Sequence, residues 1–226
     1  MLNQLLNKLE RKFGRFAIPH LMSVILVGMI VIFCGDLLMQ ANPNISEELR
    51  MQGAVSSLFE FNLAQIKAGQ VWRLVTFIFL PPDTGILFAV FVFYFTWLIG
   101  ISLETTWGSF KFNIFVLLGM IGTIIAGCIS GSATNIYLDF SMFIAFAILN
   151  PNFEVLLFFF IPIKVKWLAL LDALGLLIVL LFGTWGMKFM IIAALLNLIV
   201  FFGKDLVTAP YYAIRRQYYK HKRNQK

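Results

Sequence analysis

The chain has 226 residues, of which 60% are hydrophobic and only 13% are charged, and its formal net charge is +7. About a quarter of the residues are charged in an average soluble domain, which could not bury this much apolar surface. The composition therefore excludes an ordinary soluble enzyme and indicates an integral membrane protein. Both cysteines, Cys34 and Cys128, lie inside apolar stretches. We interpret them as packing residues and expect no disulfide, metal ion or cofactor.

The first residues predict an amphipathic segment. Between residues 2 and 16, apolar side chains recur at three- and four-residue spacing, and the opposite flank carries Lys8, Arg11, Lys12 and Arg15. This pattern is typical of a short helix lying on the membrane surface. A solvated basic tail is the alternative, and in either form the charges attract anionic lipid. Residues 1–19 form this predicted N-terminal segment.

Six apolar blocks follow and predict six membrane-spanning helices. They cover residues 20–39, 86–103, 112–130, 137–149, 167–182 and 187–202, within a predicted membrane domain of residues 20–203. A helix needs about 20 residues to cross the hydrocarbon layer. The fourth block is shorter, so it must be shielded by its neighbours or lie where the bilayer is thin.

Two connections are expected to have structure of their own. Residues 51–82 mix apolar and charged side chains and end at Pro81 and Pro82, which predicts an interfacial first external loop containing short helices. Residues 155–165 are apolar but interrupted by Pro162 and Lys164. We predict a membrane-dipping connection there, with extended backbone in its FFFIPI core, and not a seventh span.

Lysine and arginine are unevenly distributed between the span ends, which predicts the orientation because cytoplasmic connections carry the excess of these residues. With six spans and both termini inside, the opposite side holds only Arg50, Lys67, Arg73 and Lys188. The cytoplasmic side holds Lys8, Arg11, Lys12, Arg15, Lys111, Lys164, Lys166, Lys204, Arg215, Arg216, Lys220, Lys222, Arg223 and Lys226. We predict a multi-pass plasma membrane protein with both termini cytoplasmic. The basic tail, residues 204–226, is expected to bind lipid headgroups and not nucleic acid.

Two local patterns are unusual. Residues 69–79 read GQVWRLVTFIF and include Trp72 and Arg73, and residues 103–112 read LETTWGSFKF and include Glu104 and Gly108. In this order, with six spans and a long first external loop, they resemble the rhomboid superfamily of membrane proteins. The resemblance covers about residues 68–203. The predicted fold class is an all-α membrane protein, a six-helix rhomboid-like bundle with a structured interfacial loop.

The same four residues also have a physical interpretation. The amphipathic ring of Trp72 suits the interface, where Arg73 can reach phosphates or carbonyls. Glu104 is expected to end a span and accept hydrogen bonds from the backbone amides that open the next helix, while Gly108 permits a close turn. These roles are structural and independent of the family.

The resemblance implies catalytic residues that this chain does not reproduce. Active rhomboids are intramembrane serine proteases with a serine in a glycine-serine-glycine environment near the start of the fourth span, and a histidine on the sixth. Here the fourth block contains Ser141 without flanking glycines, and the sixth contains Asn197 and no histidine. His20 and His221, at the mouth of the first span and in the tail, are remote from Ser141. We therefore predict a pseudoprotease and not an enzyme.

Polar residues within the apolar blocks are the remaining candidates for a site. Asp172 should face the bundle, since a carboxylate in hydrocarbon costs several kcal/mol unless it is protonated or paired. Its candidate partners are Asp139, Ser141, Asn150 and Asn197. They form either a contact surface for a client helix or hydrogen bonds between spans, and we favour the second. Small residues in the third span, beginning at Gly119, predict its place at the bundle centre.

Three functions stay open on these observations. The first is a non-catalytic rhomboid-like protein that binds transmembrane client proteins or perturbs the local bilayer. The second is an active intramembrane serine protease with an unusual site, and the third is a small transporter that uses Asp172. Membrane lipids are the expected partners in all three, and the sequence does not specify an oligomeric state.

Overall fold

The structure, a computed structural model, describes residues 2–42, 44, 46–48, 55–157 and 161–202. Within these residues, five helices are long and apolar enough to cross a membrane. They are α2 (Leu21–Ala41), α7 (Ile86–Trp107), α8 (Ser109–Ser130), α10 (Val165–Phe182) and the unlabelled helix Trp185–Phe202. A shorter apolar helix of 14 residues, α9 (Ile136–Leu149), corresponds to the fourth predicted block. The chain is thus a mostly helical, multi-pass membrane protein.

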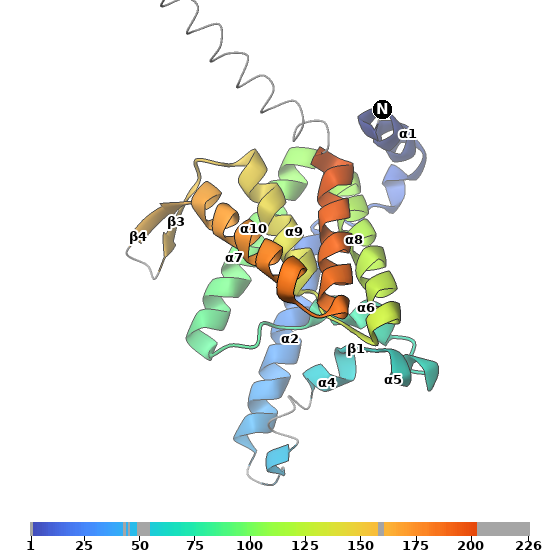
Figure 1. The fold of residues 1–226 in the computed structure, drawn as a ribbon, viewed down its shortest axis with the longest axis vertical. Coiled ribbons are helices and arrows are strands. Elements are labelled where there is room, and N and C mark those ends of the chain that lie inside the picture. The colour runs from blue at the N-terminus through green and yellow to red at the C-terminus, as the bar shows by residue number, and fades with distance from the viewer. Residues whose placement is uncertain (1, 43, 45, 49–54, 158–160, 203–226) are drawn as a thin grey trace, which may run out of the picture.

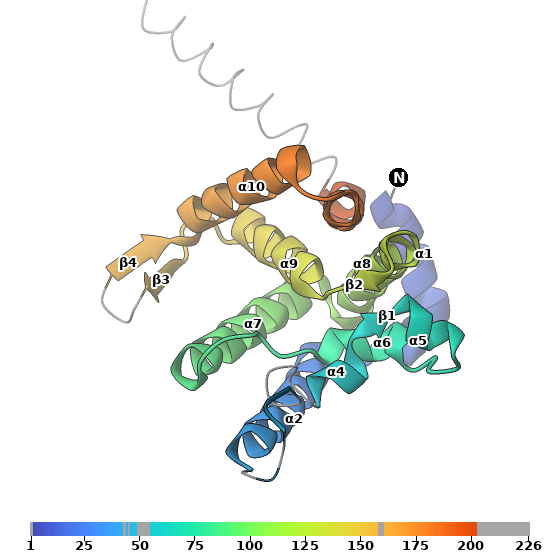
Figure 2. The same cartoon turned by 60° about the horizontal axis from the view of Figure 1, so that its bottom comes forward.

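The long helices pack around α8 and α9 (Figures 1 and 2). The buried share is largest for α8, at 39%, and smallest for α10, at 11%. Glycines explain the close packing of α8, because a Cβ at Gly119 would collide with Leu138 of α9, and one at Gly122 would lie 2.9 Å from the Cβ of Ala193. The predicted central place of the third span is confirmed.

The bundle has two ends, which we name by what lies there. At the loop end, α2 and α8 end while α7 and α9 begin. At the α1 end, α2 and α8 begin while α7 and α9 end. The helix α1 (Leu2–Phe13) and the last described residue, Phe202, both lie at the α1 end (Figure 1).

The predicted N-terminal helix is present, and it packs on the membrane domain. It consists of α1 and the 3₁₀ turn η1 (Gly14–Phe16). Leu6 is buried, and Glu10 forms an ion pair with Lys111 of α8 at 3.7 Å. The predicted basic tail, residues 204–226, lies outside the described residues.

The loop between α2 and α7, which the sequence predicted to be external, is structured, as predicted. It contains α4 (Ser56–Phe59), β1 (Phe61–Asn62), α5 (Leu63–Lys67), α6 (Arg73–Thr76) and η2 (Phe77–Phe79). The strand β1 pairs antiparallel with β2 (Ser132–Ala133), which attaches the loop to the turn between α8 and α9. The side chain of Phe61 is buried against that turn and meets Phe77 edge-on. This strand pair was not predicted.

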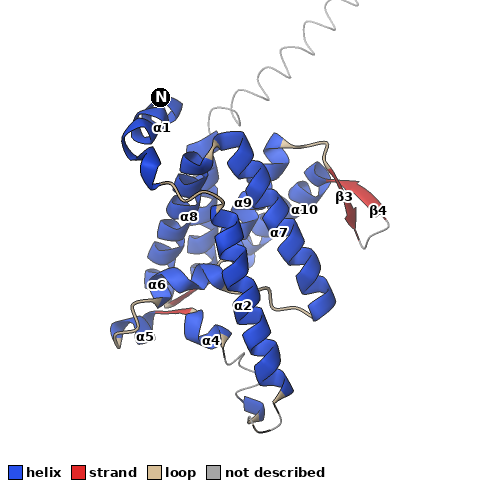
Figure 3. Cartoon of the chain, turned by 180° about the vertical axis from the view of Figure 1, so that it is seen from behind, coloured by secondary structure: helices blue, strands red, loops and turns tan. Residues whose placement is uncertain are grey.

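A second strand pair follows α9. The strands β3 (Glu154–Leu157) and β4 (Ile161–Lys164) form an antiparallel hairpin that projects beside the bundle (Figure 3). The prediction of extended backbone is confirmed for the described part of the FFFIPI core, and residues 158–160 lie outside it. Helices dominate the fold, which is consistent with the predicted all-α membrane protein, and the two short strand pairs lie in its connections.

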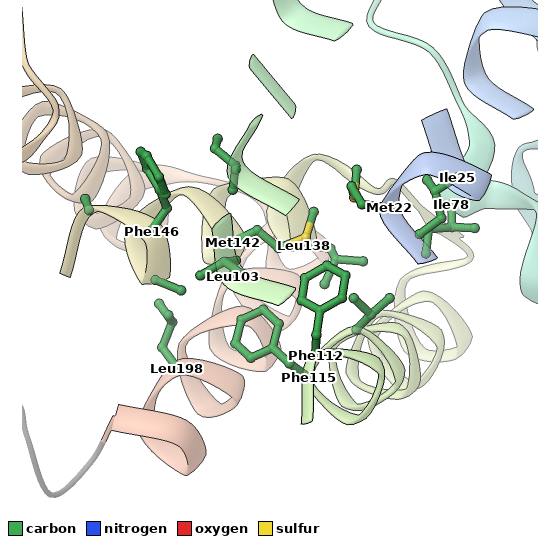
Figure 4. Packing of buried hydrophobic residues seen from close by; sticks show 14 of the residues in the cluster. Met22, Ile25, Ile78, Leu103, Phe112, Phe115, Leu138, Met142, Phe146 and Leu198 are labelled. Carbon is green, nitrogen blue, oxygen red and sulfur yellow. The ribbon is translucent and has the colours of Figure 1, made fainter. Parts of the chain in front are cut away.

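Buried hydrophobic side chains from all parts of the bundle form one main core. Figure 4 shows its centre, where Phe112 and Phe115 of α8 meet Leu138 and Met142 of α9. Met22 of α2 enters the same cluster. The core therefore holds the first, third and fourth helices together and leaves the outer faces of α7 and α10 for lipid.

Candidate functional site

Arg73 organises the loop between α2 and α7 and is almost completely buried, with 3% of its surface exposed. Its Nη1 donates to the carbonyl oxygens of Ser57 and Glu60 at 2.7 and 2.8 Å. Its Nε and Nη2 donate to the side-chain oxygens of Gln70 and Gln65 at 2.7 and 2.9 Å. The charge is thus satisfied by neutral acceptors, which are carbonyls and amides of the protein and not lipid phosphates.

Trp72, the neighbour of Arg73, has a different environment. Its ring is 52% exposed, and Nε1 donates to the carbonyl oxygen of Leu58 at 3.3 Å. An exposed indole with one satisfied polar atom is suited to the membrane interface, as the sequence predicted. The two residues have different roles: Arg73 holds the loop together from inside, and Trp72 covers the outside of the loop.

Glu104 joins three helices at the α1 end. Its Oε1 accepts from the Ser109 hydroxyl at 2.6 Å and from the His20 backbone N–H at 2.8 Å. The amide therefore belongs to the start of α2 and not, as predicted, to the start of α8. The predicted span end at Leu103 was also too early, because α7 continues to Trp107. Gly108 makes the turn with a φ of 84°, which favours glycine.

A cavity of about 990 Å³ lies at the loop end. Its walls come from the last turns of α2, the first turns of α7 and α9, and the segment 80–86. Apolar lining is supplied by Phe33, Phe93, Pro81, Pro82, Ile136 and Phe140. A space of this size and mixed character is suited to an organic ligand or a peptide segment.

The charged residues that line this cavity are all acidic. They are Asp36, Glu60, Asp83 and Asp139, and the described lining contains no lysine, arginine or histidine. Asp36 is already occupied, because Oδ1 accepts from the backbone N–H groups of Val55 and Ser56 and Oδ2 accepts from the Ser56 hydroxyl. The other three carboxylates have no described hydrogen-bonding partner. The cavity is therefore a region of negative potential.

The acidic groups are dispersed around the cavity and do not form a compact cluster. Within the described residues, no three histidine, cysteine, aspartate or glutamate side chains come close enough to hold a metal ion. Dispersed carboxylates on apolar walls suit a larger cationic group with apolar parts better than a bare ion. An arginine or lysine side chain within an apolar peptide segment has this character.

Ser141 lies below the cavity on α9 and is 1% exposed. Its hydroxyl donates to the carbonyl oxygen of Leu138 at 2.8 Å, so its proton is directed at the helix backbone. His20 lies at the α1 end, and His221 lies outside the described residues. The described structure places no histidine next to this hydroxyl.

The four polar residues predicted to form one site are dispersed. Asp139 lines the cavity, while Asn197 donates from Nδ2 to the carbonyl oxygen of Phe115 at 3.2 Å. Asp172 is half-buried on the stripe of α10 that also carries the buried Val165 and Leu176, which places it toward the bundle as expected.

None of the predicted partners reaches Asp172 among the described residues. Its Oδ2 is buried without a hydrogen-bonding partner, and so is the Oδ1 of Asn197. Asn150, the remaining predicted partner, donates to the Ser102 hydroxyl at 3.2 Å. Among the described residues, α9, α10 and the helix Trp185–Phe202 are therefore not joined by a single polar network.

Sequence reasoning missed three of the four cavity carboxylates. Asp36 was included in a span, and Glu60 and Asp83 were left in the loop. Asn135, which donates from Nδ2 to the carbonyl oxygen of Leu80 at 2.9 Å and fixes the cavity floor, was also missed. Composition gave no signal for these carboxylates, because the polar segment of residues 40–85 carries four acidic and three basic residues.

Comparison with known proteins identifies no relative: no protein-family model matches the chain, and no curated protein matches it. The resemblance to the rhomboid superfamily therefore stays a prediction.

Proposed function

We propose that this chain is a non-catalytic, rhomboid-like membrane protein that binds membrane-protein clients at the loop-end cavity. The observation that carries the proposal is the cavity itself, whose acidic residues are set among apolar walls. A client offering an apolar segment with a nearby lysine or arginine would satisfy both properties. The proposed clients are therefore transmembrane proteins with basic residues next to their spans on the loop side.

The proposal includes six crossings, with α9 as the fourth. The described cations at the α1 end are Lys8, Arg11, Lys12, Arg15, Lys111, Lys164 and Lys166. Those at the loop end are Lys67, Arg73 and Lys188. This asymmetry favours a cytoplasmic α1 end and an external loop end in the plasma membrane.

A local thinning of the bilayer is part of the same proposal. With 14 residues, α9 is about 21 Å long at 1.5 Å per residue, against a hydrocarbon layer of about 30 Å. Lipid next to its ends would have to thin, or neighbouring helices would have to cover them. Thinned lipid beside the cavity would ease the entry of a client helix.

The environment of Ser141 supports a non-catalytic function. Attack by a serine hydroxyl requires a base within hydrogen-bonding reach to accept its proton. Here the hydroxyl is buried and bonded to Leu138. The alternative of an active protease predicts cleavage of single-span substrates in lipid that is lost in Ser141→Ala, and such cleavage would overturn the proposal.

A second candidate function, transport, is favoured by one observation, the buried and unpartnered Oδ2 of Asp172. Intramembrane carboxylates often bind protons or ions during transport. Asp172 does not line the loop-end cavity, however, and no described residue donates to this oxygen. Client binding is therefore the better-supported function.

The test uses model single-span proteins that differ only in one residue, arginine or glutamate, next to the span on the loop side. A photo-crosslinker at Val92, on the cavity wall, should react preferentially with the arginine client. A crosslinker at Leu177, which is exposed on α10, is the matched position outside the cavity. Equal yields for the two clients at Val92 would contradict the proposal.

Charge variants make the test specific. In the double variant Asp83→Asn with Asp139→Asn, the preference for the arginine client should fall severalfold, because the attraction in the cavity is removed. Glu154→Gln, on β3 at the opposite end, should leave the preference unchanged. A preference that survives the double variant would show that the cavity does not select the client.

A further inference from the structure

We infer that the segment linking α1 to α2 is a binding site for anionic phospholipid headgroups at the α1 end. We call it the basic-aromatic strip and define it by Lys12, Phe13, Arg15, Phe16 and Ile18. The proposal concerns the opposite end of the molecule from the cavity and does not depend on client binding.

The strip is held close to the membrane by its connections on both sides. Before it, Leu6 is buried and Glu10 is paired with Lys111 at the start of α8. After it, α2 begins at Leu21, only a few residues beyond Ile18. Because an extended residue spans at most about 3.6 Å, Ile18 lies within about 11 Å of the first residue of this candidate span. The strip therefore lies at the level where the spans leave the hydrocarbon.

Its apolar side chains are exposed in the isolated chain. Phe16 is 67% exposed, Ile18 51% and Phe13 42%. Exposure of three neighbouring large side chains to water is unfavourable, whereas the boundary between headgroups and acyl chains accommodates them. The strip thus has an apolar surface that the rest of the bundle does not cover.

The two cations of the strip lie over the exposed rings of Phe13 and Phe16. Lys12 Nζ is 5.3 Å from the centroid of the Phe13 ring, and Arg15 Cζ is 4.8 Å from that of Phe16. Neither cation has an acidic partner among the described residues, since Glu10 pairs with Lys111. In a bilayer the acyl chains lie beneath the phosphates. A ring inserted among the acyl chains would place the cation above it at the level of the phosphates.

A second structure at the same end repeats this arrangement. At the start of α10, Lys166 Nζ is 5.4 Å from the centroid of the Trp167 ring, which is 59% exposed. Two separate segments thus present a cation above an exposed aromatic ring at the α1 end, and Lys188 above the exposed Trp185 does so at the loop end. This repetition favours a lipid surface, which extends around the bundle, over a soluble acidic protein.

The experiment measures how strongly spin-labelled phosphatidylglycerol, compared with phosphatidylcholine, associates with the full chain in bilayers. The Lys12→Gln and Arg15→Gln double variant should lose phosphatidylglycerol preference by about fivefold for each cation removed. Raising the salt concentration should weaken the preference of the unmodified chain, because exposed charges are screened. The control is Lys67→Gln, which removes an exposed loop-end cation that has no described contact with an aromatic ring, and it should retain the preference.

The remaining variants separate the contribution of the charges from that of the rings. They also keep the proposal testable if one variant fails to fold. Phe13→Ser with Phe16→Ser keeps the charges and should also weaken the preference, because the cations lose their anchored position. Lys8→Gln with Arg11→Gln removes neighbouring cations and should give a smaller loss. An unchanged preference in Lys12→Gln with Arg15→Gln, or an equal loss in the loop-end control, would overturn the proposal. Competition by inorganic phosphate would also overturn it, since that result indicates a free-phosphate site.

Discussion

The two ends of this molecule differ in charge and in packing. The loop end is hollow and acidic, and the buried cation described there, Arg73, holds the loop together. The α1 end is basic and has exposed aromatic rings, and its buried carboxylate, Glu104, joins helices. At both ends the buried charges, which are Arg73 and Asp36 at the loop end and Glu104 at the α1 end, are held by hydrogen bonds within the protein. Structural and interactive charges can thus be told apart by burial and partners.

The largest effect is expected at the loop end, from Arg73→Ala. This substitution removes all four hydrogen bonds of the guanidinium and leaves their acceptors to find other partners. Hydrogen bonds to charged groups contribute about 1.5–3 kcal/mol each, so the free energy of unfolding should fall by at least about 3 kcal/mol. Thermal unfolding in detergent measures the loss.

The control for this variant is Lys67→Ala, which removes an exposed cation from the same loop and should change stability by less than about 0.5 kcal/mol. If both variants behaved alike, the loop would not depend on the buried arginine, and the contrast between buried and exposed charge would fail.

A smaller effect is expected at the α1 end, from Glu104→Ala. The His20 amide and the Ser109 hydroxyl lose their common acceptor, which should cost about 1–3 kcal/mol of stability. Glu104→Gln keeps an acceptor oxygen and should recover most of the loss. Unfolding of the two variants, followed together, distinguishes hydrogen bonding from charge. Equal losses would mean that the charge itself is needed.

Gly119→Ala tests the close packing of α8 against α9 between the two ends. The added methyl would collide with Cδ1 of Leu138 on α9, so this buried side chain must move within a packed core. Overpacking of this kind costs about 1–3 kcal/mol. The same change at Gly175 on α10 meets nothing within 4 Å and should leave stability unchanged or slightly raised. Unfolding measurements on both decide the point, and similar losses would contradict the central place of α8.

The smallest effect is expected from Asp172→Asn, on the peripheral helix α10. No described group donates to the buried Oδ2, so neutralising the carboxylate removes a burial cost and breaks no described bond there. Stability should therefore be unchanged or slightly higher. Proton flux into vesicles is measured in parallel, and a flux that is present in the unmodified chain and lost in this variant would favour transport over client binding.

Much of the fold could be predicted because a long apolar block indicates a segment that is surrounded by lipid. A helix must satisfy its backbone within hydrocarbon, so runs of about 20 apolar residues can hardly form anything else there. The amphipathic spacing of α1 and the mixed character of residues 51–82 were informative for the same reason. The strand pair between Phe61 and Ala133 escaped prediction, because two-residue strands have no periodicity to detect.

The sequence by itself determined the membrane class, the places of the apolar helices, the charge asymmetry and the importance of Arg73 and Glu104, since these depend on local composition and spacing. Only the tertiary structure decided which groups those residues contact. Glu104 reaches an amide 84 residues away, and the cavity joins Asp36 of α2 to Asp139 of α9. Such hydrogen bonds and cavities form where segments that are distant in the sequence come together. Which segments come together depends on how helices pack, and packing depends on the shapes of side chains, as at Gly119. Hydropathy does not encode these shapes.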